Sequence, residues 1–188
     1  MTNQESELLE RYPFIQVRRV DDTVIPGQTY LSGIPKGWMA AFGSQMLNDF
    51  ANAAKEDGQK LDDLRVIDVK EKFGGLRWYW GRTGNSRRLA EVTRLYEGVS
   101  QAFCAKCGAH PVMMTCGYIL PLCKECWAEW KKRAMDPDDR SFTPEFPDIS
   151  TTVHTADGRT EETRLPIKEL FDRIVSGRDK TTENDRCR

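Results

Sequence analysis

Two closely spaced cysteine pairs constrain this chain more than any other feature. Cys104 and Cys107 form the first pair, Cys123 and Cys126 form the second, and fifteen residues separate the two pairs. A two-residue gap lets both thiolates of a pair reach one ion, and two such pairs supply the tetrahedral four-sulfur shell that Zn²⁺ prefers. We expect the zinc to be structural, because four protein ligands leave no open position for water or substrate.

Two further residues in the same segment are alternative ligands. Cys116 and His110 lie between the pairs, and either could replace one of the paired cysteines. The two symmetric pairs give the simpler tetrahedron, so we expect Cys116 to be a small buried side chain and not a ligand. Mutation of Cys116 should then leave the metal content intact.

Disulfide bonds are the other common use of six cysteines. They belong to oxidising compartments, whereas the polar and acidic stretch Met1–Glu10 lacks the cationic start and apolar run of a signal peptide. No run of about 18 apolar residues exists either. We therefore expect a cytoplasmic protein, where paired cysteine spacing favours metal.

Hydrophobic periodicity predicts an α+β fold with helices packed on a β-hairpin. Apolar residues recur at three- and four-residue steps in residues 36–57 and 87–103, which is the pattern of helices that bury one face. Between them, an alternating stretch, the pair Gly74-Gly75 and the run Leu76–Trp80 predict a hairpin that turns at the two glycines.

The same alternation predicts which hairpin side chains share a face of their strand. It places Ile67, Val69 and Phe73 together on one face of the first strand. On the second strand it places Trp78 and Trp80 on the face of Leu76, so we expect both tryptophans to belong to the core and not to a stacking platform.

Three parts are expected along the chain. We predict an α+β core in residues 1–103, a zinc module in 104–135, and an extension in 136–188 made of an acidic linker, a polar hairpin, a short helix and a disordered tail. The module reads as a cysteine turn, a hairpin and a helix that begins near Cys123, which favours a treble clef over a zinc ribbon.

Charge is distributed unevenly, a pattern that can mark a nucleic-acid or acidic-protein partner or simply form a mixed, solvated surface. Residues 65–94 carry 8 Lys and Arg against 3 Asp and Glu, whereas both ends of the chain are acidic. Within and beside the hairpin, six basic residues and three aromatic ones could hold nucleic-acid phosphates and bases, although acidic flanks could equally neutralise them. The candidate partner-binding residues are Lys70, Lys72, Arg77, Arg82, Arg87 and Arg88.

Catalysis is not expected. The chain has two histidines, His110 and His154, and neither lies in a motif that places a general base beside an open metal position. Gly74-Gly75 is a turn pair and not a phosphate-binding loop, because no Lys-Ser/Thr follows it. A metal-dependent hydrolase or nuclease is therefore the least favoured alternative.

One ordered set of motifs resembles a group of small, uncharacterised phage and bacterial proteins. The motifs are Gly37-Trp38 at the start of a helix, the hairpin Lys70-Glu-Lys-Phe-Gly-Gly-Leu-Arg-Trp-Tyr, and Cys104-x-x-Cys107-Gly108 followed by Leu122-Cys123-x-x-Cys126. The resemblance covers about residues 30 to 130. It implies a phage or prophage context and carries no established activity.

Together these observations favour a non-enzymatic, zinc-stabilised protein that binds another macromolecule. A phage context makes a host protein the favoured partner, with interference in host defence as one such role. A nucleic-acid-binding regulator that uses the basic hairpin is the alternative.

Overall fold

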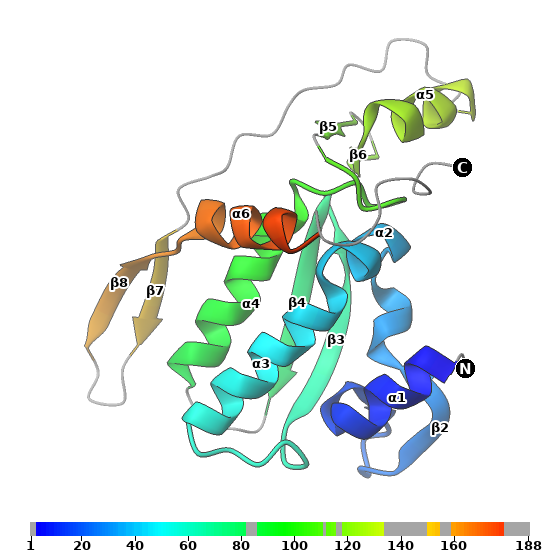
Figure 1. Cartoon of the computed structure of the whole chain (residues 1–188). Coiled ribbons are helices and arrows are strands. Elements are labelled where there is room, and N and C mark those ends of the chain that lie inside the picture. The colour runs from blue at the N-terminus through cyan, green and yellow to red at the C-terminus, as the bar shows by residue number, and fades with distance from the viewer. Residues whose placement is uncertain are drawn as a thin grey trace.

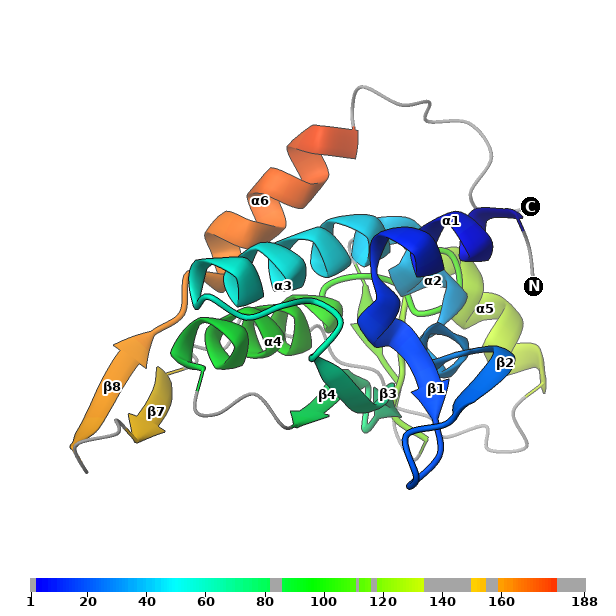
Figure 2. The same cartoon turned by 90° about the horizontal axis from the view of Figure 1, so that it is seen from below.

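The computed structural model describes residues 3–81, 86–110, 112–115, 118–133, 150–154 and 159–178. It confirms the predicted α+β fold, in which helices pack with small antiparallel sheets. Figure 2 shows helix α6 (Ile167–Arg178) on one side of the paired helices α3 (Ser44–Glu56) and α4 (Arg87–Ser100). The hairpin of strands β3 (Arg65–Lys72) and β4 (Gly75–Gly81) lies on their other side.

The helix predicted over residues 36–57 is present and contains an irregular turn. It starts as α2 (Lys36–Trp38), widens into a π-helical segment at Met39–Gly43, and continues as α3. Its inner face is buried, as its apolar periodicity requires. Gly58, with a φ of 72°, follows the end of the helix in a left-handed conformation that glycine adopts without a Cβ clash.

The predicted hairpin is present, but its turn lies one residue earlier than expected. Lys72 pairs with Gly75, so the two turn residues are Phe73 and Gly74, with φ values of 53° and 75°. Two positive φ angles are what a tight type I′ hairpin turn needs. The prediction of a Gly74-Gly75 turn is therefore wrong, because Phe73 adopts a left-handed conformation in the turn and Gly75 is the first residue of β4.

A β-bulge also changes which residues of β3 face the core. Val66 pairs with Trp80 and Asp68 pairs with Tyr79, so Ile67 is an extra residue without a partner. The bulge turns Ile67 outward, where it is 59% exposed, and Phe73 at the turn is 69% exposed. The prediction that these two side chains share a face of the strand with Val69 is therefore wrong.

Strand β4 forms the inner layer of the main core, as predicted. Leu76 and Trp78 are buried, and Trp78 stacks on Phe50 of α3 with ring centroids 4.4 Å apart. Trp80 is partly buried against the main hydrophobic cluster, which contains Phe50, Leu76 and Trp78. Ser86 caps the start of helix α4, and its hydroxyl accepts a hydrogen bond from the Leu89 N–H at 3.1 Å.

Side chains of α4 also satisfy the free edge of β4. The Leu76 N–H donates to the Ser100 hydroxyl at 2.9 Å, and the Trp78 N–H donates to the Glu97 carboxylate at 3.0 Å. Burial raises the pKa of Glu97 even though this N–H favours its charged form. These bonds fix the hairpin against α4 and satisfy two of the N–H groups on this edge.

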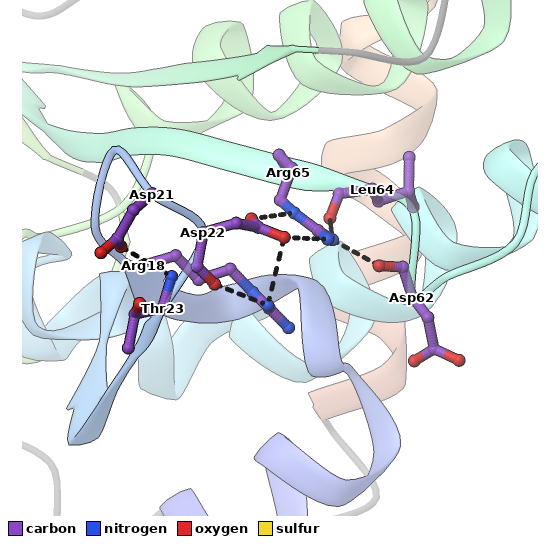
Figure 3. Close-up of polar contacts among 7 residues, drawn as sticks. All are labelled: Arg18, Asp21, Asp22, Thr23, Asp62, Leu64 and Arg65. Carbon is purple, nitrogen blue, oxygen red and sulfur yellow. Dashed lines mark hydrogen bonds and ion pairs between the residues drawn. The ribbon is translucent and has the colours of Figure 1, made fainter.

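The N-terminal elements pack beside the hairpin. They are α1 (Asn3–Arg11), β1 (Gln16–Arg18) and β2 (Val24–Thr29), joined to α2 by a short 3₁₀ turn. Figure 3 shows how the β1–β2 loop is attached to the start of β3: the Arg65 guanidinium donates to both carboxylate oxygens of Asp22, at 3.0 and 3.1 Å. Arg18 also lies against Asp22, at 3.7 Å.

The C-terminal part contributes to the main core. Strands β7 (Ser150–His154) and β8 (Thr160–Arg164) form the predicted polar hairpin, and α6 is the predicted helix after Pro166. Leu170 and Ile174 of α6 are buried in the same cluster as α3 and α4. The predicted linker up to residue 149 and the predicted tail lie outside the described residues, apart from Arg178 at the end of α6.

A polar cluster reinforces the docking of α6. The Tyr96 hydroxyl donates to the Asp49 carboxylate at 2.7 Å, and Arg173 of α6 donates to the same carboxylate at 3.3 Å. Burial raises the pKa of Tyr96 well above its ordinary value, so this hydroxyl stays protonated and remains a donor. The boundary at residue 136 stays a prediction, but α6 packs as part of the core.

Candidate metal centre

The four paired cysteines converge on one point. Each offers one Sγ, and the four Sγ atoms all lie within 4.8 Å of one another, with Cys107 and Cys123 at 3.6 Å. A tetrahedron with Zn–S bonds of about 2.3 Å has sulfur–sulfur edges of about 3.8 Å. None of the four cysteines forms a disulfide bond, so the cluster fits a metal ion and not a pair of disulfides.

Local backbone geometry explains why each pair points at the same place. After α4, the Cys104 N–H donates to the Ala109 carbonyl and the Gly108 N–H donates to the Cys104 carbonyl, both at 2.8 Å. Gly108 has a φ of 75°, which completes this tight turn. The second pair opens α5 (Lys124–Arg133), where a spacing of three residues places both thiols on one helix face.

A short hairpin joins the two pairs. Strands β5 (Met113–Met114) and β6 (Pro121–Leu122) are antiparallel, and the Ala105 N–H donates to the Pro121 carbonyl at 2.8 Å. The order of turn, hairpin and helix is the predicted one, and Figure 1 shows β5, β6 and α5 together above the end of the β3–β4 hairpin.

The electrostatics of the four thiols favour a bound cation. Burial raises the pKa of Cys104, but backbone hydrogen bonds of Cys123, Cys107 and Lys106 lower it further than burial raises it. Burial and the charge of Cys104 raise the pKa of Cys123 to about 11 and raise that of Cys126 as well. Four thiolates at these distances repel one another, and a divalent ion removes that cost.

Helix α2 is fastened directly to the first cysteine turn. The Gly37 N–H donates to the Ala105 carbonyl at 3.0 Å, and the Trp38 indole N–H donates to the Phe103 carbonyl at 2.9 Å. These two carbonyls flank Cys104. A Cβ on Gly37 would lie 2.2 Å from the Cys104 carbonyl oxygen, so only glycine allows this approach.

The turn of the β3–β4 hairpin also lies against the metal module. Glu71 Oε1 accepts a hydrogen bond from the Gly74 N–H at 2.7 Å, which stabilises the turn. A Cβ on Gly74 would meet the side chains of Met114 and Ile119 at 2.4 and 2.8 Å. The Gly37-Trp38 motif and the hairpin turn therefore both lie against the segment that carries the four cysteines.

Periodicity did not identify the docking role of Gly37 and Trp38. Both lie in the first turn of a helix, where a glycine costs stability unless something approaches its Cα closely. The signal available in the sequence was a glycine at the start of a strongly amphipathic helix, followed directly by a tryptophan.

The alternative ligand His110 lies outside the sulfur cluster. Its ring makes edge contacts with Phe103 and Phe171, at centroid distances of 5.9 and 5.5 Å. Among the described residues, the four paired cysteines form the group of metal-ligating atoms that could hold an ion. Cys116, the other alternative, lies outside the described residues.

Substitution of either alternative ligand should leave the metal in place. We expect His110→Ala and Cys116→Ser to retain the full metal content, because neither side chain is needed to complete the tetrahedron. Metal analysis of the purified variants checks this expectation. A loss of half or more of the metal in either variant would assign that residue to the site in place of a paired cysteine.

The predicted basic residues are distributed over two regions. Lys70 forms an ion pair with Asp68, and Arg77 donates to the Leu76 carbonyl at 2.7 Å. At the start of α4, each arginine has a carboxylate partner in helix α4 or at the end of α3, as in the pairs Arg87–Glu91 at 2.8 Å, Arg88–Asp57 at 2.6 Å and Arg88–Glu56 at 3.2 Å. Lys72 lies over the Phe73 ring at 5.3 Å, and Arg82 lies outside the described residues.

A pocket of about 350 Å³ lies where the module meets the core. Its walls are mainly apolar, and its rim carries the Lys106–Glu129 ion pair and the exposed Tyr118. The lining residues are Pro35, Glu71, Ala105, Lys106, Tyr118, Leu120, Leu122, Cys126, Glu129 and Trp130. Sequence reasoning missed this pocket because it forms between segments that are distant in the chain.

In the part of the chain that the structure describes, no helix combines the length and apolar character needed to span a bilayer. Comparisons of the chain with family models, with curated proteins and with solved structures found no match. The four-cysteine cluster, which could bind a metal ion, is therefore the functional feature that the structure itself shows.

Proposed function

We propose that the four cysteines hold one structural zinc ion, and that the protein binds another macromolecule without catalysing a reaction. The observation that carries this proposal is the convergence of four thiols within 4.8 Å, which supplies a complete tetrahedral shell of protein ligands. When bound, zinc would act as a cross-link between the cysteine turn and α5. The resemblance to phage proteins supports a host protein as the partner.

The surface around the metal module supports a protein partner. Tyr118, which lines the apolar pocket, is 65% exposed, and Phe73 at the hairpin turn is 69% exposed. Aromatic side chains and partly buried pockets are typical of the centres of protein interfaces.

Site-specific crosslinking tests this proposal. We expect a photoreactive phenylalanine analogue at position 118 to capture one dominant protein in cells that naturally carry the gene. The same analogue at Val20 is the matched control, because Val20 is fully exposed in the β1–β2 loop and away from the module. Equal crosslinking from both positions, or none from position 118, would count against the proposed interface.

Nucleic-acid binding is the second candidate, and the outer face of the β3–β4 hairpin favours it. Lys70 and Lys72 lie on this face with Tyr79, which is 45% exposed, so cations and an aromatic ring lie side by side. We expect any such binding to weaken steeply with salt and to be reduced by Lys72→Gln. Absence of a gel shift at low salt would exclude this candidate, and Lys168→Gln on α6 is the control.

A further inference from the structure

We infer that the pocket between the module and the hairpin is a zinc-dependent anchor site for a peptide segment of the partner, in which a large apolar side chain is followed by lysine or arginine. This inference rests on the proposed function and names the partner chemistry. The pocket of about 350 Å³ is of a size that ligand sites use, and its walls are formed by Pro35, Leu120, Leu122 and Trp130, among others. It therefore suits one large apolar side chain.

The charges around the pocket select the neighbouring residue of the partner. Lys106 and Glu129 form an ion pair on the rim, so their charges offset each other. Glu71 is the remaining charged residue of the lining. One of its carboxylate oxygens accepts the Gly74 N–H, and the other makes no hydrogen bond or ion pair in the described part of the chain. A cationic side chain complements this oxygen.

The same charge argues against a nucleic acid in this pocket. A phosphate placed beside Glu71 would be repelled, and most of the pocket wall is apolar. The hairpin face that carries Lys70 and Lys72 is a separate surface, so the two candidate partners use different residues.

The pocket depends on zinc because residues of both the core and the metal module line it. Pro35 and Glu71 belong to the core, whereas Leu122, Cys126 and Trp130 belong to the metal module. Cys126 is a predicted zinc ligand and also part of the pocket lining. Loss of the ion therefore removes one wall and should abolish binding.

Nuclear magnetic resonance of the zinc-loaded full chain tests this inference with three short peptides. The probes are N-acetyl-Gly-Leu-Arg-Gly-amide, the same peptide with Glu in place of Arg, and the same peptide with Ala in place of Leu. We expect the Trp130 indole signal to shift saturably with the Leu-Arg peptide. The Leu-Glu peptide should bind about threefold to fivefold more weakly, as for one partly exposed charge pair, and the Ala-Arg peptide should give no saturation.

A conservative variant separates charge from folding. Glu71→Gln keeps an oxygen that accepts the Gly74 N–H but removes the charge, so it should bind the Leu-Arg and Leu-Glu peptides equally. Glu169→Gln on the exposed side of α6 should keep the wild-type preference. Equal binding of the two peptides by the wild-type chain, or no saturable shift, would overturn the inference.

The two proposals fail in different ways. If the purified protein holds no metal, the proposed structural zinc site fails before any peptide is added. If the zinc-loaded protein is folded and its Trp130 signal is unmoved by all three peptides, the anchor site alone is wrong.

Discussion

Removal of the metal is expected to unfold residues 104–133 while the α3–α4–hairpin core stays folded. The module has a small core of its own, in which three of the five buried residues are cysteines, joined by Val112 and Leu122. So few apolar groups do not offset the entropy of ordering about thirty residues. Structural zinc contributes on the order of 10 kcal/mol of apparent binding free energy, which is enough to decide whether the module folds.

Hydrogen exchange with and without a strong chelator measures this effect. We expect the amides of Gly108 and Trp127, whose hydrogen bonds lie beside the cysteines, to lose protection when the metal is removed. The amides of β3 and β4 should remain protected, because their cluster is separate and larger. Cys126→Ser should reproduce the chelated pattern, and Cys116→Ser is the matched control. Unchanged protection in the module after complete metal removal would contradict the zinc-stabilised account.

Gly37→Ala is expected to destabilise the protein by about 3 kcal/mol and to weaken metal binding. The new Cβ would lie 2.2 Å from the Cys104 carbonyl oxygen, a contact with backbone that no rotamer change relieves. Overpacking of this kind costs roughly 1–3 kcal/mol, and displacement of α2 also costs the Gly37 and Trp38 hydrogen bonds, about 1 kcal/mol each. Alanine gains about 1 kcal/mol in helix propensity, so the packing cost exceeds the gain.

Whether Gly37→Ala lowers or raises the stability of the protein directly tests the packing of α2 against Cys104. Chemical denaturation of Gly37→Ala should show a loss of stability, whereas Gly177→Ala in α6 should show none, since nothing lies within 4 Å of a Cβ at Gly177. Competition with a colorimetric zinc chelator should show weaker metal binding in Gly37→Ala alone. If Gly37→Ala were as stable as the wild-type chain, the close approach of α2 to Cys104 would be wrong.

Local patterns in the sequence predicted the elements and the sulfur cluster. Cysteine spacing is a local property, so the pairing of Cys104 and Cys107 could be read from the chain, and their convergence with the second pair followed from the preference of zinc for four sulfurs. The burial of Trp78 likewise followed from strict alternation along β4.

The errors arose where one residue departs from regular geometry. The bulge at Ile67 adds one residue to β3 and reverses the facing that alternation assigns, and no residue type in that stretch signals a bulge. Phe73 adopts a positive φ that bulky side chains seldom take. The sequence pattern therefore placed the turn at the two adjacent glycines, one residue too late. The pocket depends on how the module lies against the hairpin, which is a tertiary property.

The meeting of distant motifs gives the phage-protein resemblance a physical meaning, although membership itself stays a prediction. Gly37-Trp38 docks on the first cysteine turn, and the hairpin turn with Glu71 and Gly74 contacts the β5–β6 segment. Residues that look unrelated along the chain therefore support a single centre. We expect proteins that share these motifs to share this junction.

Metal analysis of the purified chain tests the central claim most directly. Native mass spectrometry under reducing conditions, combined with elemental analysis, should find one zinc ion per chain and no disulfide among the four paired cysteines. Cys104→Ser/Cys126→Ser should lose the ion, and Cys116→Ser should keep it. A wild-type chain that is folded and contains no stoichiometric metal, or a double variant that keeps its zinc, would contradict the account.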